Sequence, residues 1–128
     1  MASGFPAATG DVMTAAMFNG LVTYTLNTQS GATYTVANSD LYQALVITSN
    51  ASTKTVTIAP DSTLTAAANG SAITFLNTGA GNLTFAAGSG VTITSAGATS
   101  SAPTLGQYKT AVAIRTGANA WTIVGAVS

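Results

Sequence analysis

The sequence predicts an all-β fold, a single antiparallel β-sandwich (or open barrel) of short strands. From Leu21 onward, Thr, Val, Ile and aromatic residues alternate in short runs that are separated by Gly, Asn, Ser and Asp. Two of the separating segments contain Gly and lie between matched runs, as in β-hairpins. With 128 residues, 47% of them hydrophobic, the chain is long enough for one domain with a packed core.

Residues 1–20 differ from the rest and are expected to form an extended N-terminal arm, followed by the sandwich domain at 21–128. The first ten residues are mostly small and are interrupted by Pro6, which is typical of extended chain. The two parts therefore have different roles in the predicted molecule, with the core confined to the second.

A short helical turn is predicted within the arm. Thr14 can cap its start, and Asn19 or Gly20 can end it in the left-handed conformation. Met13 and Phe18 can pack against each other across the turn. Because one turn of helix is not stable alone in water, it must pack on its own sandwich or on a neighbouring subunit.

The β pattern predicts nine strands, of which four form two hairpins. The runs 73–75 and 83–85 flank the turn 78–81, and the runs 112–114 and 121–123 flank the turn 117–119. Alternation places Ile73 with Phe75, Val56 with Ile58, and Val91 with Ile93 on buried faces. The predicted strands are 21–27, 33–36, 41–48, 54–58, 72–77, 82–86, 91–94, 108–116 and 120–124.

Segments 72–85 and 111–123 resemble each other, which suggests a duplication. A solenoid needs at least three stacked units, so two copies favour a sandwich or barrel. The Gly-, Ala-, Ser- and Thr-rich segment 95–103 is expected to be an exposed loop that can serve as a contact surface.

Charge is nearly absent from the sequence. Charged residues make up 5% of the chain, against about 25% in ordinary soluble domains, and the net charge is zero. Nucleic-acid binding and attraction to anionic membranes both need a basic patch, so neither is expected. Such a surface suits a subunit that is packed against neighbours. The charged residues are Asp11, Asp40, Asp61, Lys54, Lys109 and Arg115.

The sequence offers little catalytic chemistry, so an enzyme is not expected. It has no His, no Glu and no Cys, which removes the commonest general base, the usual metal ligands and any thiolate. The three Asp residues lie in turn-like contexts, where Asp usually caps the turn. Only Lys54 or Lys109 could activate a Ser or Thr nucleophile, and no motif surrounds either one. No catalytic residue, cofactor or metal site is predicted.

The candidate functional residues are apolar and belong to a protein interface. Trp121 is a candidate anchor, although a core position is the alternative for a Trp in a sandwich. Four tyrosines, Tyr24, Tyr34, Tyr42 and Tyr108, could stack on sugars if they lined one face. The candidate interface residues are Phe5, Val12, Met13, Met17, Phe18 and Trp121.

The segment 9–19, Thr-Gly-Asp-Val-Met-Thr-Ala-Ala-Met-Phe-Asn, resembles the N-terminal "GDVLTAADLN" type of motif in tailed-bacteriophage virion proteins, including fibre and head-decoration components. Segments 70–77, 90–93 and 108–125 are similar to β modules of the same proteins, so the resemblance covers about half of the chain. One position departs from the motif. Met17 stands where the family usually has an acidic residue that completes a capping box, which puts an apolar group on the turn.

The resemblance implies a virion protein, either a capsid decoration (cement) protein or a tail-fibre component. A single small domain with an arm favours the decoration protein. Its partners would be the major capsid protein and, in a homotrimer, copies of itself. It would lie on the outer capsid surface after synthesis in the host cytoplasm, since the N-terminus lacks a signal-peptide pattern and no apolar run could span a membrane.

Three other functions remain open at this point. A tail-fibre or receptor-binding module would recognise host glycans through aromatic and hydroxyl groups. A surface-polysaccharide hydrolase would have to rely on the three Asp residues. A bacterial surface adhesin is disfavoured by the missing signal sequence.

Overall fold

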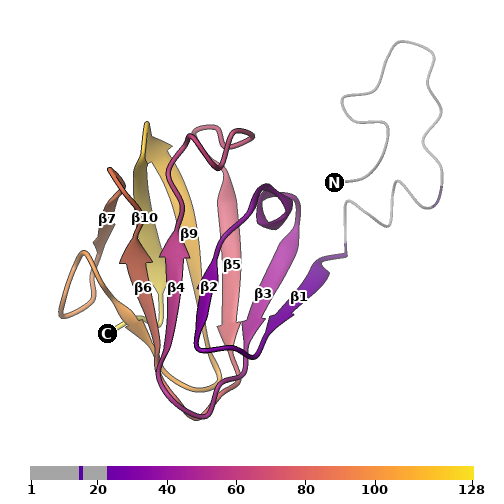
Figure 1. The fold of residues 1–128 in the computed structure, drawn as a ribbon, viewed down its shortest axis with the longest axis vertical. Helices are drawn as coiled ribbons and strands as arrows, with labels where there is room; N and C mark the ends of the chain where they lie inside the picture. The colour runs from indigo at the N-terminus through magenta and orange to yellow at the C-terminus, as the bar shows by residue number, and fades with distance from the viewer. Residues whose placement is uncertain (1–14, 16–22) are drawn as a thin grey trace.

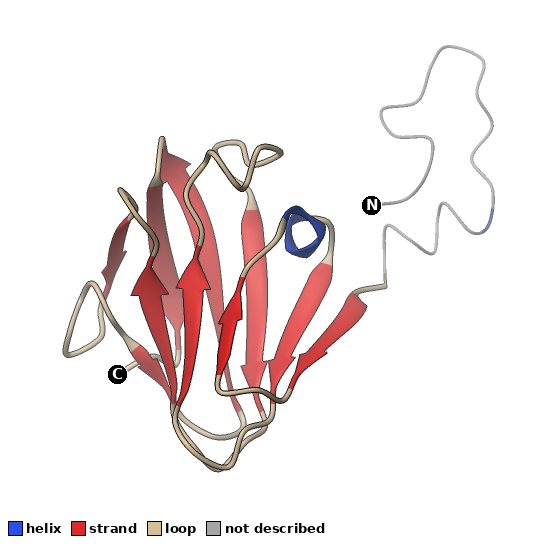
Figure 2. Cartoon of the chain, in the orientation of Figure 1, coloured by secondary structure: helices blue, strands red, loops and turns tan. Residues whose placement is uncertain are grey.

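The computed structural model describes Ala15 and residues 23–128, and these form short strands and one 3-10 helix, η1 (Asn38–Leu41). Figure 2 shows that strands dominate this part of the chain. In chain order they are β1 (Thr25–Gln29), β2 (Thr33–Thr35), β3 (Ala44–Thr48), β4 (Lys54–Ile58), β5 (Ala72–Asn77), β6 (Leu83–Ala87), β7 (Thr92–Ser95), β8 (Thr104–Leu105), β9 (Lys109–Gly117) and β10 (Ala120–Gly125). The predicted all-β class is confirmed.

The strands form two sheets that pack face to face. Sheet A has the order β1-β3-β5-β9-β10-β7, and sheet B has the order β2-β4-β6-β8. In Figure 1, β2, β4 and β6 lie in front of the strands of sheet A. Successive strands from β1 to β6 alternate between the two sheets, so the chain winds from one layer to the other.

This winding makes the sheets mixed, which corrects the predicted antiparallel sandwich. β1 pairs with β3 and β3 with β5 in parallel, and β2 pairs with β4 and β4 with β6 in the same way. Antiparallel pairs join β9 to β5 and β10, and β8 to β6. The first six strands are therefore three stacked coils, each with one strand per sheet.

The second and third coils are related by the same sequence offset in both sheets. Leu45 of β3 pairs with Thr74 of β5, and Lys54 of β4 pairs with Leu83 of β6, 29 residues further along in both cases. The first coil is shorter, since Thr25 pairs with Ala44 only 19 residues later. The duplication suggested for 72–85 and 111–123 is thus not the repeat on which the fold is built.

The predicted hairpin at 73–85 is wrong, because β5 and β6 lie in different sheets and are joined by an arch. This arch stacks closely on the arch between β3 and β4. A Cβ on Gly79 would lie 2.1 Å from the carbonyl oxygen of Asn50, and one on Gly81 would lie 1.9 Å from that of Ser52. Glycine is required at both places by this approach. The second predicted hairpin, β9 with β10, is confirmed.

The core fills the space between the sheets. The predicted buried residues Ile73, Phe75, Val56 and Ile58 are fully enclosed, Ile93 is buried, and Val91 packs against the core from its margin. The rings of Phe75 in sheet A and Phe85 in sheet B meet edge to face, with centroids 5.0 Å apart. Trp121 of β10 also lies in this core.

A polar network closes the core at its first coil. Asp40 of η1 accepts hydrogen bonds from Tyr34 Oη at 2.6 Å, from Asn27 Nδ2 at 2.8 Å and from the backbone N–H of Ala37 at 2.9 Å. Gln29 donates to Asn27 at 2.7 Å. Burial raises the pKa of Tyr34 to about 12, and the hydrogen bond to Asp40 adds to this effect. Polar side chains thus end the stack, as in the capping units of repeat proteins.

Candidate protein-binding surface

Arg115, Asp61 and Lys54 make structural contacts through their charged groups. Arg115 makes a two-pronged contact with Asp61, at 2.7 Å from Nη2 and 3.2 Å from Nε, and also donates to Asn69 at 2.7 Å. The guanidinium holds the pKa of the Asp61 carboxyl below its usual value, with help from the N–H of Asn119. This pair ties the segment after β4 to the β9–β10 hairpin.

Lys54 points into the sandwich, and its residue is only 1% exposed. Its Nζ donates to the carbonyl of Gly31 in the first arch, and burial lowers its pKa. The cation therefore supports the stacking of the first two coils. Among the described residues, no group of three or more His, Cys, Asp or Glu side chains could hold a metal ion.

The outer face of sheet A carries a group of aliphatic side chains. On β3, Ala44, Val46 and Thr48 are buried toward the core, so Leu45 and Ile47 point outward. The pairing extends Leu45 into a row across five strands, formed by Leu26, Leu45, Thr74, Val112 and Val124. Leu26 is 64% exposed and Val124 is 45% exposed.

Beside this row lie Ile47, Leu76 and Ile114, which are partly exposed. The partly buried side chains that pack on the core do not include any of these outward residues, so core packing does not account for their apolar character. Within the described strands of sheet A, no outward position holds a charged residue. Apolar surface that is continuous and uncharged is typical of a site for another protein.

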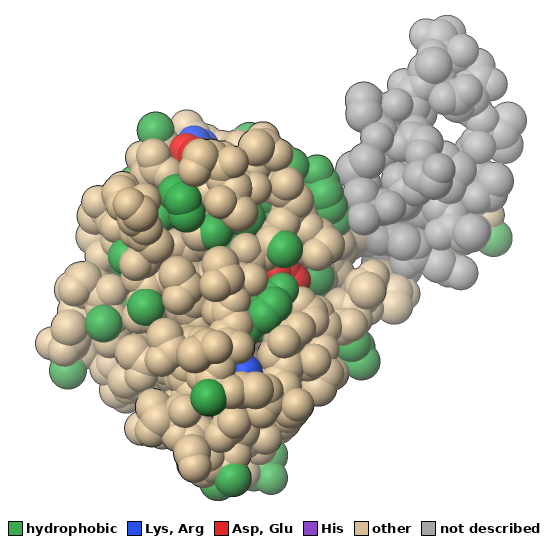
Figure 3. Space-filling view, viewed as in Figure 1, with side chains coloured by type: hydrophobic (Ala, Val, Ile, Leu, Met, Phe, Trp, Pro, Cys, Tyr) green, Lys and Arg blue, Asp and Glu red, His purple; other side chains and the backbone are tan. Residues whose placement is uncertain are grey.

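The outer face of sheet B is different. Its outward positions carry Thr33, Thr55, Thr84 and Thr104 in one unbroken row across the four strands. Figure 3 views the molecule from this side and shows mostly uncharged polar side chains and backbone over β2, β4 and β6. Both faces lie outside the core, so core packing cannot explain why one is aliphatic and the other hydroxylated.

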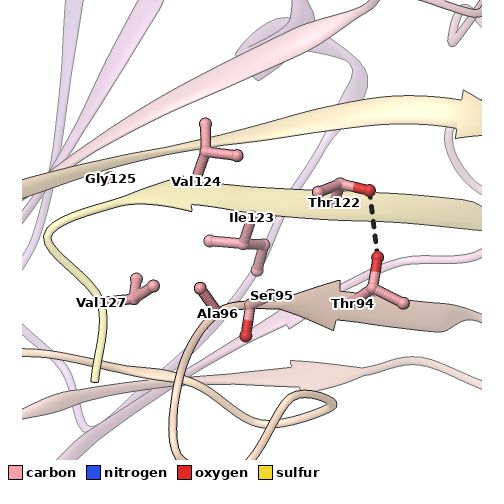
Figure 4. A pocket seen from close by; sticks show the side chains of 8 residues that line it. All are labelled: Thr94, Ser95, Ala96, Thr122, Ile123, Val124, Gly125 and Val127. Carbon is pink, nitrogen blue, oxygen red and sulfur yellow. Dashed lines mark hydrogen bonds between the residues drawn. The ribbon is translucent and has the colours of Figure 1, made fainter.

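The aliphatic row ends at a pocket of about 390 Å³. β7 pairs with β10 only as far as Ser95 and Ile123, and the pocket lies where β10 continues with β9 but without β7. Figure 4 shows Ile123, Ala96 and Val127 around it, while Thr94 and Thr122 hydrogen-bond to each other at 3.0 Å on its flank. No charged side chain lines this pocket. Its chemistry suits an apolar side chain of a partner.

The predicted interface residues divide into two groups. Trp121 is 1% exposed, so its place is the core and its side chain is not a surface anchor, as the alternative interpretation of this residue expected. The other five, Phe5, Val12, Met13, Met17 and Phe18, lie outside the described residues. Ala15, the one described residue of the predicted arm, is helical and exposed.

The four tyrosines do not all line one face. Tyr108 precedes β9, whose Lys109 pairs with the last residue of β5, whereas Tyr24 precedes β1, whose Thr25 pairs with the first residue of β3. Because β3 and β5 run parallel, Tyr108 and Tyr24 lie at opposite ends of the strands. Tyr34 points inward and is bound to Asp40. A sugar platform made of all four tyrosines, as considered from the sequence, is therefore not formed.

Sequence reasoning missed the outer face of sheet A, although a signal was present. The β3 segment Ala-Leu-Val-Ile-Thr is apolar at four successive positions, as in strands that are covered on both faces. The β4 segment Lys-Thr-Val-Thr-Ile alternates, as in strands with one wet face.

Comparison with protein-family models, curated proteins and solved structures found no match. No helix among the described residues is long and apolar enough to cross a membrane.

Proposed function

We propose that this chain is a capsid decoration (cement) protein of a tailed bacteriophage, which binds the outer surface of the head and stabilises the shell by clamping neighbouring major capsid subunits. The observation that carries the proposal is the contrast between the two outer faces. Sheet A presents an uncharged aliphatic row and sheet B a row of threonines. One face is thus suited to bind protein and the other to face solvent.

A cement protein must bind at many equivalent places with modest energy at each. Every 100 Å² of apolar surface buried contributes about 2.5 kcal/mol before the cost of association is subtracted. A contact that lacks charged groups also depends little on salt. In this role the chain performs no catalysis, and its partners are the major capsid protein and the other copies of a homotrimer.

The N-terminal segment supplies the second contact of the proposed clamp. Phe5, Val12, Met13, Met17 and Phe18 give it apolar side chains, and its resemblance to virion motifs includes residues 9–19. The described sheets begin at Thr25, so a chain without residues 1–20 retains every strand. We expect this truncated protein to fold but to be lost from particles. Normal incorporation of the truncated protein would contradict the clamp.

Copy number tests the function itself. Quantitative mass spectrometry of purified virions gives the ratio of this chain to the major capsid protein. A ratio near one, or a simple fraction such as one third, is the expected result for a protein that covers the shell. A ratio of a few per hundred would place it in the tail, and its absence would remove the virion function.

A tail-fibre module that binds host glycans is the second candidate, and the threonine row of sheet B favours it. Hydroxyl groups in register can exchange hydrogen bonds with sugars. This candidate predicts binding to host cells or their polysaccharide that weakens in the variant Thr55→Val with Thr84→Val. A flat response of the natural protein to both ligands would reject it.

A further inference from the structure

We propose that the outer face of sheet A binds residues 12–22 of a second copy of this chain, so that exchanged N-terminal segments join the copies. The inference rests on the proposed function, because a segment held on its own sheet could not connect two subunits. It names the occupant of the aliphatic row and predicts which residues meet there.

The chemistry of the segment matches that of the face. Between residues 12 and 22 the sequence contains no charged side chain and six large apolar ones, and the outward positions of sheet A are also uncharged. The polar side chains on the two surfaces are those of Thr14 and Asn19 in the segment and of outward threonines of sheet A such as Thr74, Thr110 and Thr122. Contact between the two surfaces therefore buries no charged side chain, which avoids the largest desolvation cost. The apolar residues of the segment are Val12, Met13, Met17, Phe18, Leu21 and Val22.

The segment is also long enough. The row from Leu26 to Val124 crosses five strands and so measures about 19 Å, at about 4.8 Å per strand spacing. Eleven residues span about 17 Å as a helix and up to about 36 Å when extended. Residues 12–22 can thus cover most of the row as a helix, and when extended they can cover all of it and reach the pocket at its end.

The pocket gives this contact a defined end point. Val124 belongs both to the aliphatic row and to the pocket wall, so a chain that follows the row arrives there. Ala96, Ile123 and Val127 complete an apolar socket. Met17 is the side chain we assign to it, since a flexible thioether adapts to an irregular space.

Area explains why the segment is needed. Six strands of about five residues give sheet A an outer face of about 400 Å², from the usual strand spacing and rise. Stable interfaces bury about 800 Å² on each partner, so two such faces pressed together would be too small. An aromatic side chain alone can bury about 150–250 Å², and Phe18 lies in the exchanged segment. Each copy gives one segment and receives one, an arrangement that closes into a ring such as a trimer.

Cross-linking tests the proposal directly, because the natural chain contains no cysteine. A tagged Met17→Cys chain is mixed with an untagged Val124→Cys chain and treated with a short bismaleimide. In an equal mixture, half of the Met17→Cys segments meet a Val124→Cys neighbour, so we expect a covalent heterodimer in up to about half of the chains. The matched control replaces Val124→Cys by Thr57→Cys on the outer face of sheet B, and its yield should be at least tenfold lower. Thermal unfolding of each variant confirms that the strands are intact.

A double variant, Met17→Cys with Val124→Cys, separates the two possible origins of the segment. Links that join different chains, formed at a concentration at which the oligomer is intact, support exchange between copies. A linked monomer that persists on dilution overturns the proposal, because the segment would then belong to the same chain. Equal linking to Val124→Cys and Thr57→Cys also overturns it.

The proposed function is tested separately by the copy number in virions. If the ratio of this chain to the major capsid protein fits a shell-wide protein but no Met17–Val124 links form, only the proposal of an exchanged segment is rejected. Efficient links in a protein that is absent from particles would retain the oligomer and remove the cement function.

Discussion

Asn77, at the end of β5, is held by four hydrogen bonds. Its Nδ2 donates to the carbonyls of Gly81 and Leu105, and its Oδ1 accepts from Thr48 Oγ1 and the N–H of Gly79. Asn77→Asp keeps the shape but removes both donors. We expect a loss of about 1–3 kcal/mol in the free energy of unfolding for each carbonyl left unpaired.

Denaturant unfolding measures the effect of Asn77→Asp. The exposed Asn82 in the same arch provides the control, because Asn82→Asp changes the charge equally at a solvated position. Its free energy of unfolding should change by less than about 0.5 kcal/mol. Similar losses in both variants would mean that charge, and not the hydrogen-bond network, decides.

The raised pKa of Tyr34 predicts that the free energy of unfolding falls at alkaline pH. Its pKa is raised from 10.0 to about 12 by burial and by the hydrogen bond to Asp40. The folded state therefore binds the phenolic proton more tightly than the unfolded state does. The contribution is complete below pH 10 and is lost as the pH rises from 10 to 12.

Urea unfolding at pH 9 to 12 tests this linkage. Tyr34→Phe should be less stable than the natural protein at pH 9, because two hydrogen bonds of the hydroxyl are missing. It should then lose less stability between pH 10 and 12. Parallel curves for the two proteins would show that Tyr34 does not cause the alkaline loss.

At the scale of elements, the close stacking of neighbouring arches should limit which residues can stand at Gly79. Gly79→Ala places a methyl group within 2.1 Å of a backbone oxygen of the arch below, which cannot move aside as a side chain can. We expect separation of the second and third coils and a loss of at least about 3 kcal/mol, in the upper range for overpacking. Thermal unfolding is the measurement.

Gly31→Ala is the matched control, since Gly31 lies in the first arch. The nearest atom to its added Cβ is 3.8 Å away, an ordinary contact distance. This variant should unfold close to the natural protein. If it were as unstable as Gly79→Ala, the loss would arise from arch flexibility and not from close stacking.

Most individual strands could be predicted from the sequence, but their partners could not. Alternation in 73–75 and 83–85 correctly gives the buried residues, yet it is the same for a hairpin and for an arch. The two differ only in whether the strands pair with each other or with strands 29 residues away. β1 begins at Thr25 and not at Leu21, and the two-residue β8 carries too short a pattern to detect.

The candidate site was predicted even less completely. For Trp121 the sequence left two alternatives, an interface anchor or a core position. Its burial follows from the position of β10 between β9 and β7. The row on sheet A unites Leu26, Leu45, Val112 and Val124, which are up to 98 residues apart. Only the mixed strand order brings them together.

For the molecule as a whole, the two outer faces should respond oppositely to matched substitutions. Leu45→Thr with Val112→Thr gives sheet A the surface of sheet B and leaves β-branched residues, which suit strands, at both positions. We expect weaker self-association and at least twofold less binding of a hydrophobic dye, with the thermal unfolding midpoint within a few degrees of the natural one. Sedimentation and dye fluorescence measure these effects.

Thr57→Val with Thr55→Val makes the reverse change on sheet B. Self-association through the natural contact should persist in this variant. Loss of association in both variants, or in neither, would contradict the assignment of sheet A as the binding face.

The constant 29-residue offset between the second and third coils has a consequence for how such chains can change over generations. The first coil carries the polar network at one end, and the antiparallel strands β8 and β9 close the other. A duplication of one 29-residue unit in between would lengthen the module without altering either end. The number of coils can thus change while both ends of the stack stay the same. One kind of sequence can therefore form both short and long modules.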